Sequence, residues 1–310
     1  MTRVFIDGSA GTTGLRIRER LSARTDIELI TLTEALRKDA AARRDALGAA
    51  DIAFLCLPDD AAREAVALAA NSDAAIIDTS TAHRTAAGWT YGMAELAGQR
   101  SRIAASKRVA NPGCHASGFI ALVAPLVRAG VLSPQAKLSC FSLTGYSGGG
   151  KKMIAEYEGE NRSHLLNAPR QYGLNQRHKH LPEMAAICGL DQPPMFSPIV
   201  ADFYSGMEVS VPLFGEWVEG GVARVKEVFS DVYRGPVVRY VEGADEGGFL
   251  SAAALSRRDD MEISVTGDDA RLLLTARFDN LGKGASGAAI QNMNILMGVD
   301  ETTGLILKEA

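Results

Sequence analysis

Residues 3–14 read Arg-Val-Phe-Ile-Asp-Gly-Ser-Ala-Gly-Thr-Thr-Gly, and this stretch decides the fold of the first third of the chain. It places a short apolar run, Val4-Phe5-Ile6, directly before three glycines at a GxxGxxG spacing. The next segment, 15–23, carries leucine and alanine at helical spacing. A strand, a glycine turn and a helix in this order let the backbone approach a pyrophosphate at the positive end of the helix. The stretch predicts a dinucleotide-binding unit, and an ordinary tight turn is the alternative.

Further strand-like runs continue the pattern outward from this unit. They cover residues 27–31, 52–57 and 75–79, and residues 61–70 have a helical pattern. Strands that alternate with helices predict a parallel, doubly wound sheet of the Rossmann type.

From about Leu138 the pattern changes to longer alternating runs. Residues 207–213, 222–229 and 271–278 alternate apolar and polar side chains, with only modest helical signal between them. This part predicts a second, α+β domain with a mixed or antiparallel sheet. Residues 286–297 again predict a helix.

The composition is that of an ordinary globular protein of 310 residues, 46% hydrophobic and 23% charged, which is long enough for two domains. A net charge of -4 gives no broad positive field, so nucleic acid is not an expected partner. The start lacks a signal peptide, and the apolar run 119–127 contains Pro125 and is too short to span a bilayer. The four cysteines form no CxxC pair, which favours thiols in a reducing compartment. These features predict a cytoplasmic protein that does not bind membranes.

The type of dinucleotide is suggested by charges after the second predicted strand. No carboxylate stands at its end near Thr31, and Arg37 and Lys38 follow. A ribose 2′-phosphate attracts such charges, so NADP is favoured, although Glu34 leaves NAD open and a solvated helix face is the alternative. Pro58, at the end of the third strand, is expected beside the ribose. The expected cofactor contacts in this part of the chain are Gly8, Ser9, Gly11, Thr12, Thr13, Gly14, Arg37, Lys38 and Pro58.

The most informative stretch is Asn111-Pro-Gly-Cys-His-Ala-Ser-Gly118, which leads into the apolar run from Phe119. A cysteine at the first turn of a helix feels the N-terminal dipole, which lowers its pKa and favours the nucleophilic thiolate. Cys114 is therefore the predicted nucleophile, whereas small buried cysteines are the interpretation for Cys56, Cys140 and Cys188.

A thiol nucleophile needs a proton acceptor and donor, and imidazole suits that task near pH 7. Two of the five histidines, His178 and His180, stand in Gln176-Arg-His-Lys-His-Leu-Pro-Glu183. In an extended segment their alternation would place both rings on one side of the chain. No third ligand lies at convincing spacing, so no metal site is expected.

Three motifs together resemble one family across nearly the whole chain. Asn-Pro-Gly-Cys at 111–114, His-x-His-x-Pro-Glu at 178–183 and Asn-Leu-Gly-Lys-Gly-Ala-Ser-Gly-Ala-Ala-Ile-Gln-Asn at 280–292 are similar to N-acetyl-γ-glutamyl-phosphate reductase. The short length, the glycine stretch 7–14 and Asp-Thr-Ser-Thr-Ala-His-Arg at 78–84 resemble its shorter, second type.

The resemblance implies NADPH-dependent reduction of N-acetyl-L-glutamyl 5-phosphate to the 5-semialdehyde, with release of phosphate, in arginine biosynthesis. It implies that Cys114 carries the acyl group as a thioester and that His180 is the acid/base, oriented by Glu183. His178 is expected at the substrate, and the sequence does not rank it against His180 beyond motif position.

A substrate with a carboxylate and a phosphate also needs cations and amides. Arg84 and Lys151, with its neighbour Lys152, are the expected cationic contacts, although an exposed turn is the alternative for the two lysines. The turn 147–150 is expected to offer backbone amides, as its family counterpart does, and a structural hairpin is the alternative. Ser147, Gly148, Arg84, Lys151 and His178 form the expected substrate set.

The resemblance also implies the domain organisation. Residues 1–113 would form the NADP-binding domain, completed by the C-terminal helix 286–310, and residues 114–285 the catalytic and oligomerisation domain. Gly284 would lie near the nicotinamide and Asn292 would face the cofactor, a polar helix position being the alternative. The family suggests a homodimer or homotetramer.

Four alternatives remain open. Aspartate-semialdehyde dehydrogenase resembles the chain in fold and thioester chemistry but carries its histidine in a different motif. A reductase of another N-blocked acyl phosphate would differ only in pocket shape. A cysteine hydrolase or acyltransferase would use Cys114 and His180 without NADP, and a non-catalytic NADP sensor would not need Cys114 at all.

Overall fold

The computed structural model describes residues 1–308. The chain forms two compact units. The first contains residues 1–94, 98–113 and 285–305, and the second contains 95–97, 114–284 and 306–308. The chain thus leaves the first unit before Cys114 and returns to it after Gly284.

The first unit is built on a six-stranded sheet in the order β2-β1-β3-β4-β6-β5, with parallel pairing throughout. Both faces of its central strands are buried, which explains their nearly continuous apolar runs. The predicted parallel, doubly wound sheet is confirmed. Its strands are β1 (Thr2–Asp7), β2 (Ile27–Ile30), β3 (Ile52–Leu55), β4 (Ala75–Asp78), β5 (Thr90–Tyr91) and β6 (Arg108–Ala110).

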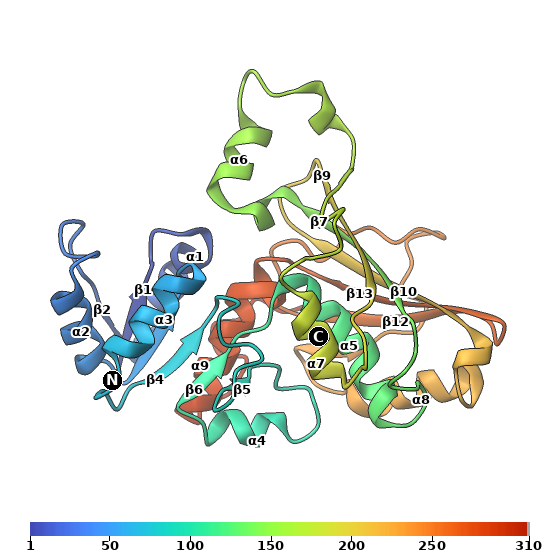
Figure 1. Cartoon of the computed structure of the whole chain (residues 1–310), viewed down its shortest axis with the longest axis horizontal. Coiled ribbons are helices and arrows are strands. Elements are labelled where there is room, and N and C mark those ends of the chain that lie inside the picture. Colours follow the sequence, from blue (N-terminus) through green and yellow to red (C-terminus); the bar gives the residue numbers. More distant parts are fainter. Residues whose placement is uncertain (309–310) are drawn as a thin grey trace. The chain divides into compact units, whose positions relative to one another are not determined.

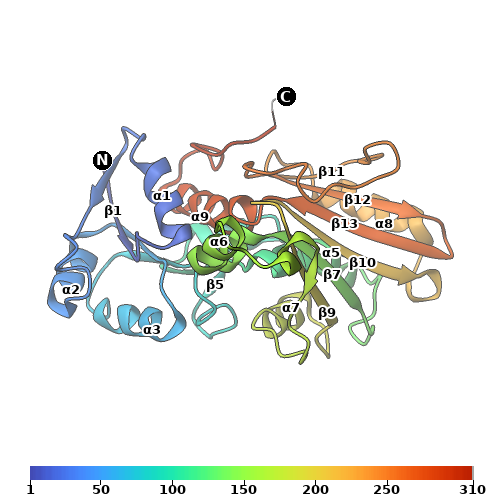
Figure 2. The same ribbon diagram turned by 90° about the horizontal axis from the view of Figure 1, so that it is seen from above.

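Helices cover both faces of this sheet. Small side chains of α2 and α3, such as Ala46 and Ala62, pack with Phe5 and Leu55 in one cluster. The alanine-rich α2 was not predicted, because its pattern is weakly amphipathic and follows a polar stretch. A second hydrophobic cluster contains side chains of α1 and α9, which lie beside each other (Figure 2). The helices are α1 (Thr12–Leu21), α2 (Ala40–Ala49), α3 (Asp59–Leu68), α4 (Gln99–Ala104) and α9 (Gly287–Met297).

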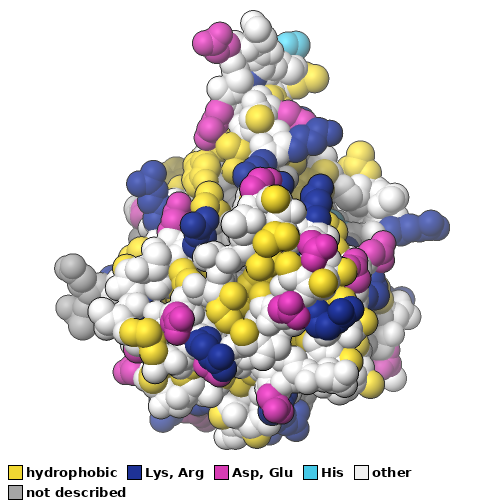
Figure 3. All heavy atoms as spheres, turned by 90° about the vertical axis from the view of Figure 1, so that its left-hand side faces the viewer, with side chains coloured by type: hydrophobic (Ala, Val, Ile, Leu, Met, Phe, Trp, Pro, Cys, Tyr) yellow, Lys and Arg dark blue, Asp and Glu magenta, His cyan; other side chains and the backbone are white. Residues whose placement is uncertain are grey.

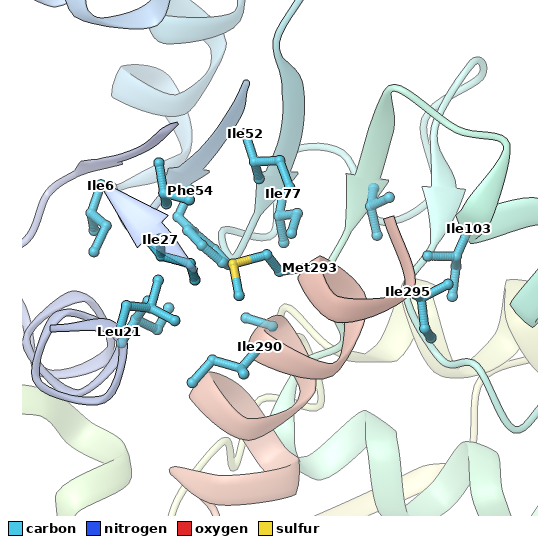
Figure 4. Packing of buried hydrophobic residues seen from close by; sticks show 14 of the residues in the cluster. Ile6, Leu21, Ile27, Ile52, Phe54, Ile77, Ile103, Ile290, Met293 and Ile295 are labelled. Carbon is cyan, nitrogen blue, oxygen red and sulfur yellow. The ribbon is translucent and has the colours of Figure 1, made fainter. Parts of the chain in front are cut away.

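Helix α9 comes from the end of the chain and completes the core of the first unit. Ile290 and Met293 of α9 pack against Phe54 and Ile77 of the central strands (Figure 4). The predicted C-terminal helix is present over this segment but is shorter than predicted, because it ends at Met297 and residues 298–308 are not helical. Ile306, by contrast, belongs to the second unit, where its backbone exchanges hydrogen bonds with Asp259. Residues 309 and 310 of the predicted C-terminal segment lie outside the described residues.

The second unit is built on a seven-stranded mixed sheet in the order β11-β12-β13-β10-β7-β9-β8 (Figure 1). The long antiparallel ladder of β12, β13 and β10 forms its centre, and β7 pairs with β9 in parallel. The predicted mixed sheet is confirmed. Its strands are β7 (Ser139–Gly145), β8 (Arg170–Gln171), β9 (Met195–Ala201), β10 (Met207–Phe214), β11 (Val238–Tyr240), β12 (Met261–Gly267) and β13 (Arg271–Phe278).

Helices α5 and α8 pack on one face of this sheet, and α7 packs against α5. Helix α5 contacts β10 and β13 through an almost wholly apolar, buried surface, and α8 lies along β12. A π-helical turn at Gly282–Ser286 precedes α9. The helices of this unit are α5 (Cys114–Arg128), α6 (Gly150–Glu158), α7 (Leu181–Cys188) and α8 (Gly221–Val232).

One predicted strand is wrong. Residues 222–229 lie in the helix α8 rather than in an alternating strand. Val225, Val228 and Phe229 are the buried positions, at the three- and four-residue spacing of a helix face. The segment is rich in valine, a residue that favours strands, but Val222, Val225 and Val228 recur every three residues rather than every two.

No helix within residues 1–308 combines the length and hydropathy needed to cross a bilayer. On the face drawn in Figure 3, lysine and arginine side chains are interspersed with aspartate and glutamate rather than gathered in one patch. This mixed surface agrees with the net charge of -4.

Candidate active site

The glycine turn after β1 leaves no room for side chains. Gly8 has a φ of +88°, and a Cβ there would collide with the carbonyl oxygen of Cys56. A Cβ on Gly14 would come within 2.5 Å of the Gly8 carbonyl oxygen. Because α1 begins at Thr12, the turn presents backbone N–H groups at a helix N-terminus. These residues therefore fit a dinucleotide pyrophosphate.

A small hollow, open to solvent, adjoins this turn. Arg37 lines it and forms a 2.5 Å ion pair with Glu34, and Arg18 of α1 lines it as well. Lys38 is exposed and is not among the lining residues, so the structure brings only the first of the two predicted charges to the hollow. Pro58 is the N-cap of α3, directly after β3, as its predicted place requires. The lining residues are Phe5, Ile6, Asp7, Gly8, Ser9, Arg18, Leu29, Ile30, Thr31, Leu32 and Arg37.

The chain before the predicted nucleophile is fixed through Asn111, which is 1% exposed. Its backbone N–H donates to Asp78 O at 2.7 Å, and its carbonyl accepts from Arg84 Nε at 3.0 Å. Its side-chain oxygen accepts from Asn292 Nδ2 at 3.1 Å. Arg84 and Asn292, predicted at the substrate and the cofactor, are buried and fix Asn111, Arg84 through the Asn111 backbone carbonyl and Asn292 through the Asn111 side chain.

The same loop contains a buried carboxylate network. Asp78 accepts from Ser80 Oγ at 2.7 Å and contacts His83 Nδ1 at 2.6 Å. The His83 ring stacks on Trp89 with a centroid separation of 4.2 Å. These contacts order the 79–89 loop that carries Arg84.

Cys114 is the first residue of α5 and is partly exposed, so its predicted position at a helix N-terminus is confirmed. A Cβ added to Gly284 would lie 2.9 Å from Cys114 Cβ. Gly284 therefore packs against the nucleophile, and its predicted nicotinamide contact stays a prediction.

Rings from three segments gather beside the start of α5. The centroid of the His178 ring is 4.8 Å from that of His180 and 5.6 Å from that of His115. His180 is 4% exposed and is the N-cap of α7, and its backbone N–H donates to His178 Nδ1 at 3.3 Å. The backbone is a turn rather than the predicted extended segment, yet it brings both rings to one place. Glu183 follows in the first turn of α7 and is buried.

His115 and Tyr172 complete this cluster and were not singled out in the sequence. His115 Nε2 lies 2.7 Å from Tyr172 Oη, and His115 Nδ1 lies 2.6 Å from Ser142 Oγ. Burial, aided by His178 and Lys179, lowers the pKa of His115 to about 3. Burial, and then the charge of Cys114, raise the pKa of Tyr172. Only the position of His115 directly after Cys114 signalled it; nothing in the sequence pattern around Tyr172 did.

The predicted substrate turn has a structural partner. Ser147 is 1% exposed, and its hydroxyl accepts from Asn280 Nδ2 at 3.0 Å. Gly148 follows it in the same 3₁₀ turn, and Lys151 and Lys152 are exposed near the start of α6. The Ser147 side chain is thus occupied in fixing the turn, and substrate binding here stays a prediction. Within residues 1–308 no group of three or more His, Cys, Asp or Glu side chains is placed to hold a metal ion.

Comparison with known proteins identifies the family. Residues 31–105 match the semialdehyde dehydrogenase NAD binding domain, and residues 114–280 match the semialdehyde dehydrogenase dimerisation domain. A relative from Brucella anthropi, named N-acetyl-gamma-glutamyl-phosphate reductase, is 49% identical over 306 residues, covering 96% of this chain and 98% of its own. A relative of the same name from Brucella ovis is 48% identical, with 96% and 99% covered. The chain belongs to the N-acetyl-gamma-glutamyl-phosphate reductase family.

Solved structures similar to this reductase-family chain are aspartate semialdehyde dehydrogenases. The Vibrio cholerae enzyme II, complexed with ASA, has a TM-score of 0.72 at 16% identity and covers 96% of this chain and 98% of its own. The Candida albicans enzyme, solved with NADP, has a TM-score of 0.68 at 14% identity, with 96% and 98% covered. At such identities the likeness establishes the fold, in agreement with the two sheets described above.

Proposed function

We propose that the protein reduces N-acetyl-L-glutamyl 5-phosphate to N-acetyl-L-glutamate 5-semialdehyde with NADPH, releasing phosphate, as a step of arginine biosynthesis. The observation that carries the proposal is Cys114 at the N-terminus of α5, next to His115, whose ring lies 5.6 and 5.5 Å from those of His178 and His180, in a chain 49% identical to a reductase of that name. A thiol with imidazoles within reach is the arrangement for covalent acyl transfer.

The proposed reaction has two stages, formation of a thioester on Cys114 Sγ and reduction of that thioester. Cys114 Sγ forms a bond to the acyl carbon, and the bond from that carbon to the phosphate oxygen breaks, leaving a thioester. His180 gives the departing phosphate one proton, which is the one proton that the overall reduction consumes. After the thioester carbon has gained a hydride, its oxyanion re-forms the carbonyl, and the carbon–sulfur bond breaks to release the aldehyde and the Cys114 thiolate. Glu183, in the first turn of α7, is the proposed orienting group for His180.

NADPH supplies the hydride when it is bound. The residues that would hold it are the glycine turn, where a Cβ on Gly8 or Gly14 would clash, and Arg37 with Arg18 at the hollow beside it. Two guanidinium groups suit a ribose 2′-phosphate better than two ribose hydroxyls. The further proposed contacts are Ser9, Gly11, Thr12, Thr13, Lys38, Pro58, Gly284 and Asn292.

The substrate is proposed to meet His178, the 147–150 turn, Lys151 and Arg84. For Arg84 the structure favours an indirect role, because its guanidinium donates to two backbone carbonyls. We propose that the first unit is the NADP-binding domain and the second the catalytic and oligomerisation domain of a cytoplasmic homodimer or homotetramer. The matched dimerisation domain at 114–280 supports this assembly.

The function is tested by following NADP reduction in the reverse direction. The purified chain is given N-acetylglutamate semialdehyde, with inorganic phosphate present or omitted. We expect reduction that depends on phosphate, and a loss of at least about 1,000-fold in Cys114→Ser, because removal of a covalent nucleophile leaves only binding effects. The control variant is Cys188→Ser, at a buried cysteine of α7, which should retain activity.

Substrate selectivity is tested with a panel of aldehydes in the same assay. Faster turnover of aspartate semialdehyde, or of a blocked semialdehyde of another chain length, would replace the proposed substrate. Hydrolysis of acyl donors without any nicotinamide change, or full activity of Cys114→Ser, would contradict the thioester reduction altogether.

A further inference from the structure

A buried hydroxyl group, a partly buried one and one imidazole form a continuous hydrogen-bonded line next to the nucleophile. His115 is 3% exposed and lies on α5, next to Cys114. Its Nδ1 meets Ser142 Oγ of β7 at 2.6 Å, and its Nε2 meets Tyr172 Oη at 2.7 Å. Both ring nitrogens of His115 are therefore hydrogen-bonded, Nδ1 to Ser142 of the sheet and Nε2 to Tyr172.

The His115 ring carries a single N–H at any working pH. Burial, together with the facing His178 and Lys179, lowers the pKa of His115 to about 3. His180 and Phe196 close the remaining sides of the ring, with centroids at 5.5 and 5.3 Å. A neutral imidazole donates from one nitrogen and accepts at the other, so the two hydroxyl groups cannot play the same part.

Ser142 decides which nitrogen carries the proton. Its side chain is completely buried, and His115 Nδ1 is its hydroxyl's one hydrogen-bond partner among residues 1–308. A buried O–H that donated nowhere would carry the cost of an unsatisfied donor. The Ser142 hydroxyl therefore donates to Nδ1, which places the ring proton on Nε2.

The position of the ring proton on Nε2 determines the hydrogen bonding of Tyr172. With Nε2–H donating to it, the Tyr172 oxygen accepts, and its own O–H is left to donate elsewhere. Within the described residues this hydroxyl has no other hydrogen-bond partner than His115. Tyr172 also feels the charge of Cys114, so its unused donor belongs to the surroundings of the reacting sulfur.

We propose that Tyr172 donates a hydrogen bond to the oxyanion that forms on an acyl group attached to Cys114, and that Ser142 and His115 are positioning residues that aim this donor. Tyr172 keeps its proton throughout, and no bond to it is made or broken. The inference rests on the proposed function only in taking Cys114 as an acyl acceptor.

The test separates acylation of the sulfur from simple alkylation. Attack of Cys114 on p-nitrophenyl acetate passes through a tetrahedral oxyanion, whereas alkylation by iodoacetamide does not. Tyr172→Phe should slow the first reaction about 100-fold, the usual effect of removing one oxyanion donor, and should leave the second within about twofold. Cys114→Ser establishes how much of each signal comes from this sulfur.

Tyr233→Phe is the matched control. Tyr233 is buried, whereas Tyr172 is partly buried, and the Tyr233 hydroxyl also bonds to α5, through the carbonyl oxygen of Ala121 at 2.6 Å. The acylation and alkylation rates of Tyr233→Phe should both equal those of the wild type. If Tyr172→Phe slows both reactions equally, or neither, the proposed oxyanion contact is wrong.

Ser142→Ala tests the positioning claim. Without the Ser142 donor the ring proton is free to move to Nδ1, and Tyr172 is then free to donate to Nε2. We expect a loss of about tenfold in acylation with unchanged alkylation. In ¹⁵N-histidine spectra of the wild type, Nε2 of His115 should be protonated and Nδ1 not, from pH 5 to 9. A proton on Nδ1 would overturn the proposal.

These measurements use neither NADPH nor the natural substrate. A chain that shows the expected rates and tautomer but no phosphate-dependent NADP reduction would keep this inference and lose the proposed function. The opposite result would keep the function and lose the inference.

Discussion

Gly284 is the residue on which the packing of the nucleophile depends most directly. A methyl group there would lie 2.9 Å from Cys114 Cβ and 3.2 Å from the carbonyl oxygen of Asp279. Gly284→Ala should therefore displace Cys114 and destabilise the fold by about 1–3 kcal/mol. We expect the iodoacetamide labelling rate of Cys114 and the urea midpoint to change together.

Gly48 provides the matched control for this substitution. It lies within α2, and a Cβ there would meet no atom within 4 Å. Gly48→Ala should stabilise the helix by about 0.5–1 kcal/mol and leave Cys114 labelling unchanged. Equal effects of the two substitutions would show that the contact with Cys114 has no special importance.

Among single residues, the sequence predicted the nucleophile but not the side chains that contact its neighbour His115. Cys114 was predictable because a Pro-Gly turn before an apolar run predicts a helix start, and α5 begins there. Tyr172 and Ser142 were not, because a serine in a strand and a tyrosine in a loop have no pattern of their own. They become meaningful only when pairing of β7 with β10 and β9 fixes where each side chain points.

The helix α9 is tied to the loop before Cys114 by Asn292. The Asn292 amide donates to Gly92 O at 2.9 Å and to Asn111 Oδ1, and the side chain is completely buried. Asn292→Ala would leave both acceptors buried without this donor, so the free energy of unfolding should fall by about 2–4 kcal/mol in urea.

Val299, just beyond the same helix, is the control for that substitution. It is 39% exposed, and Val299→Ala should change the free energy of unfolding by no more than about 0.5 kcal/mol. A stable Asn292→Ala protein with weaker NADP binding would instead favour the predicted contact of Asn292 with the cofactor.

Helices and strands were predicted well where the apolar residues follow one clear spacing. The central strands of the first sheet are buried on both faces and give unbroken apolar runs, and β13 places Leu272, Leu274, Ala276 and Phe278 on one face. Helix α8 was mistaken for a strand because its segment is rich in β-branched valine, although Val222, Val225 and Val228 recur every three residues, as on a helix face. The two-residue strands β5 and β8 are too short for any period and depend on their neighbours.

The stability of the whole second unit should depend on pH through His115. The pKa of His115 is lowered by burial to about 3, below its ordinary value of 6.5, so the unfolded chain binds this proton first as the pH falls. The contribution to stability is present above about pH 6.5 and is lost between there and about pH 3. Between pH 6 and 4 it lowers the free energy of unfolding by about 1.4 kcal/mol per pH unit.

A comparison of His115→Gln with His164→Gln isolates the contribution of His115 to the pH dependence of stability. His115→Gln should show a shallower fall of the urea midpoint with acid than the wild type, whereas His164→Gln, at an exposed position, should follow the wild type. In a Trp89→Phe background the fluorescence of Trp217 follows the second unit alone, since Trp89 lies in the first. Parallel curves for His115→Gln and the wild type would contradict a neutral His115.

The return of α9 to the first sheet also orders events during translation. The strands of the first unit leave the ribosome early, but Ile290 and Met293, which cover Phe54 and Ile77, are made almost last. At ordinary bacterial or eukaryotic elongation rates the interval from residue 113 to residue 297 is on the order of 10–40 s. During that time the second unit, nearly continuous in sequence, is free to fold, while the part of the nascent parallel sheet that α9 will cover remains exposed beside α1 and is a natural target for chaperones.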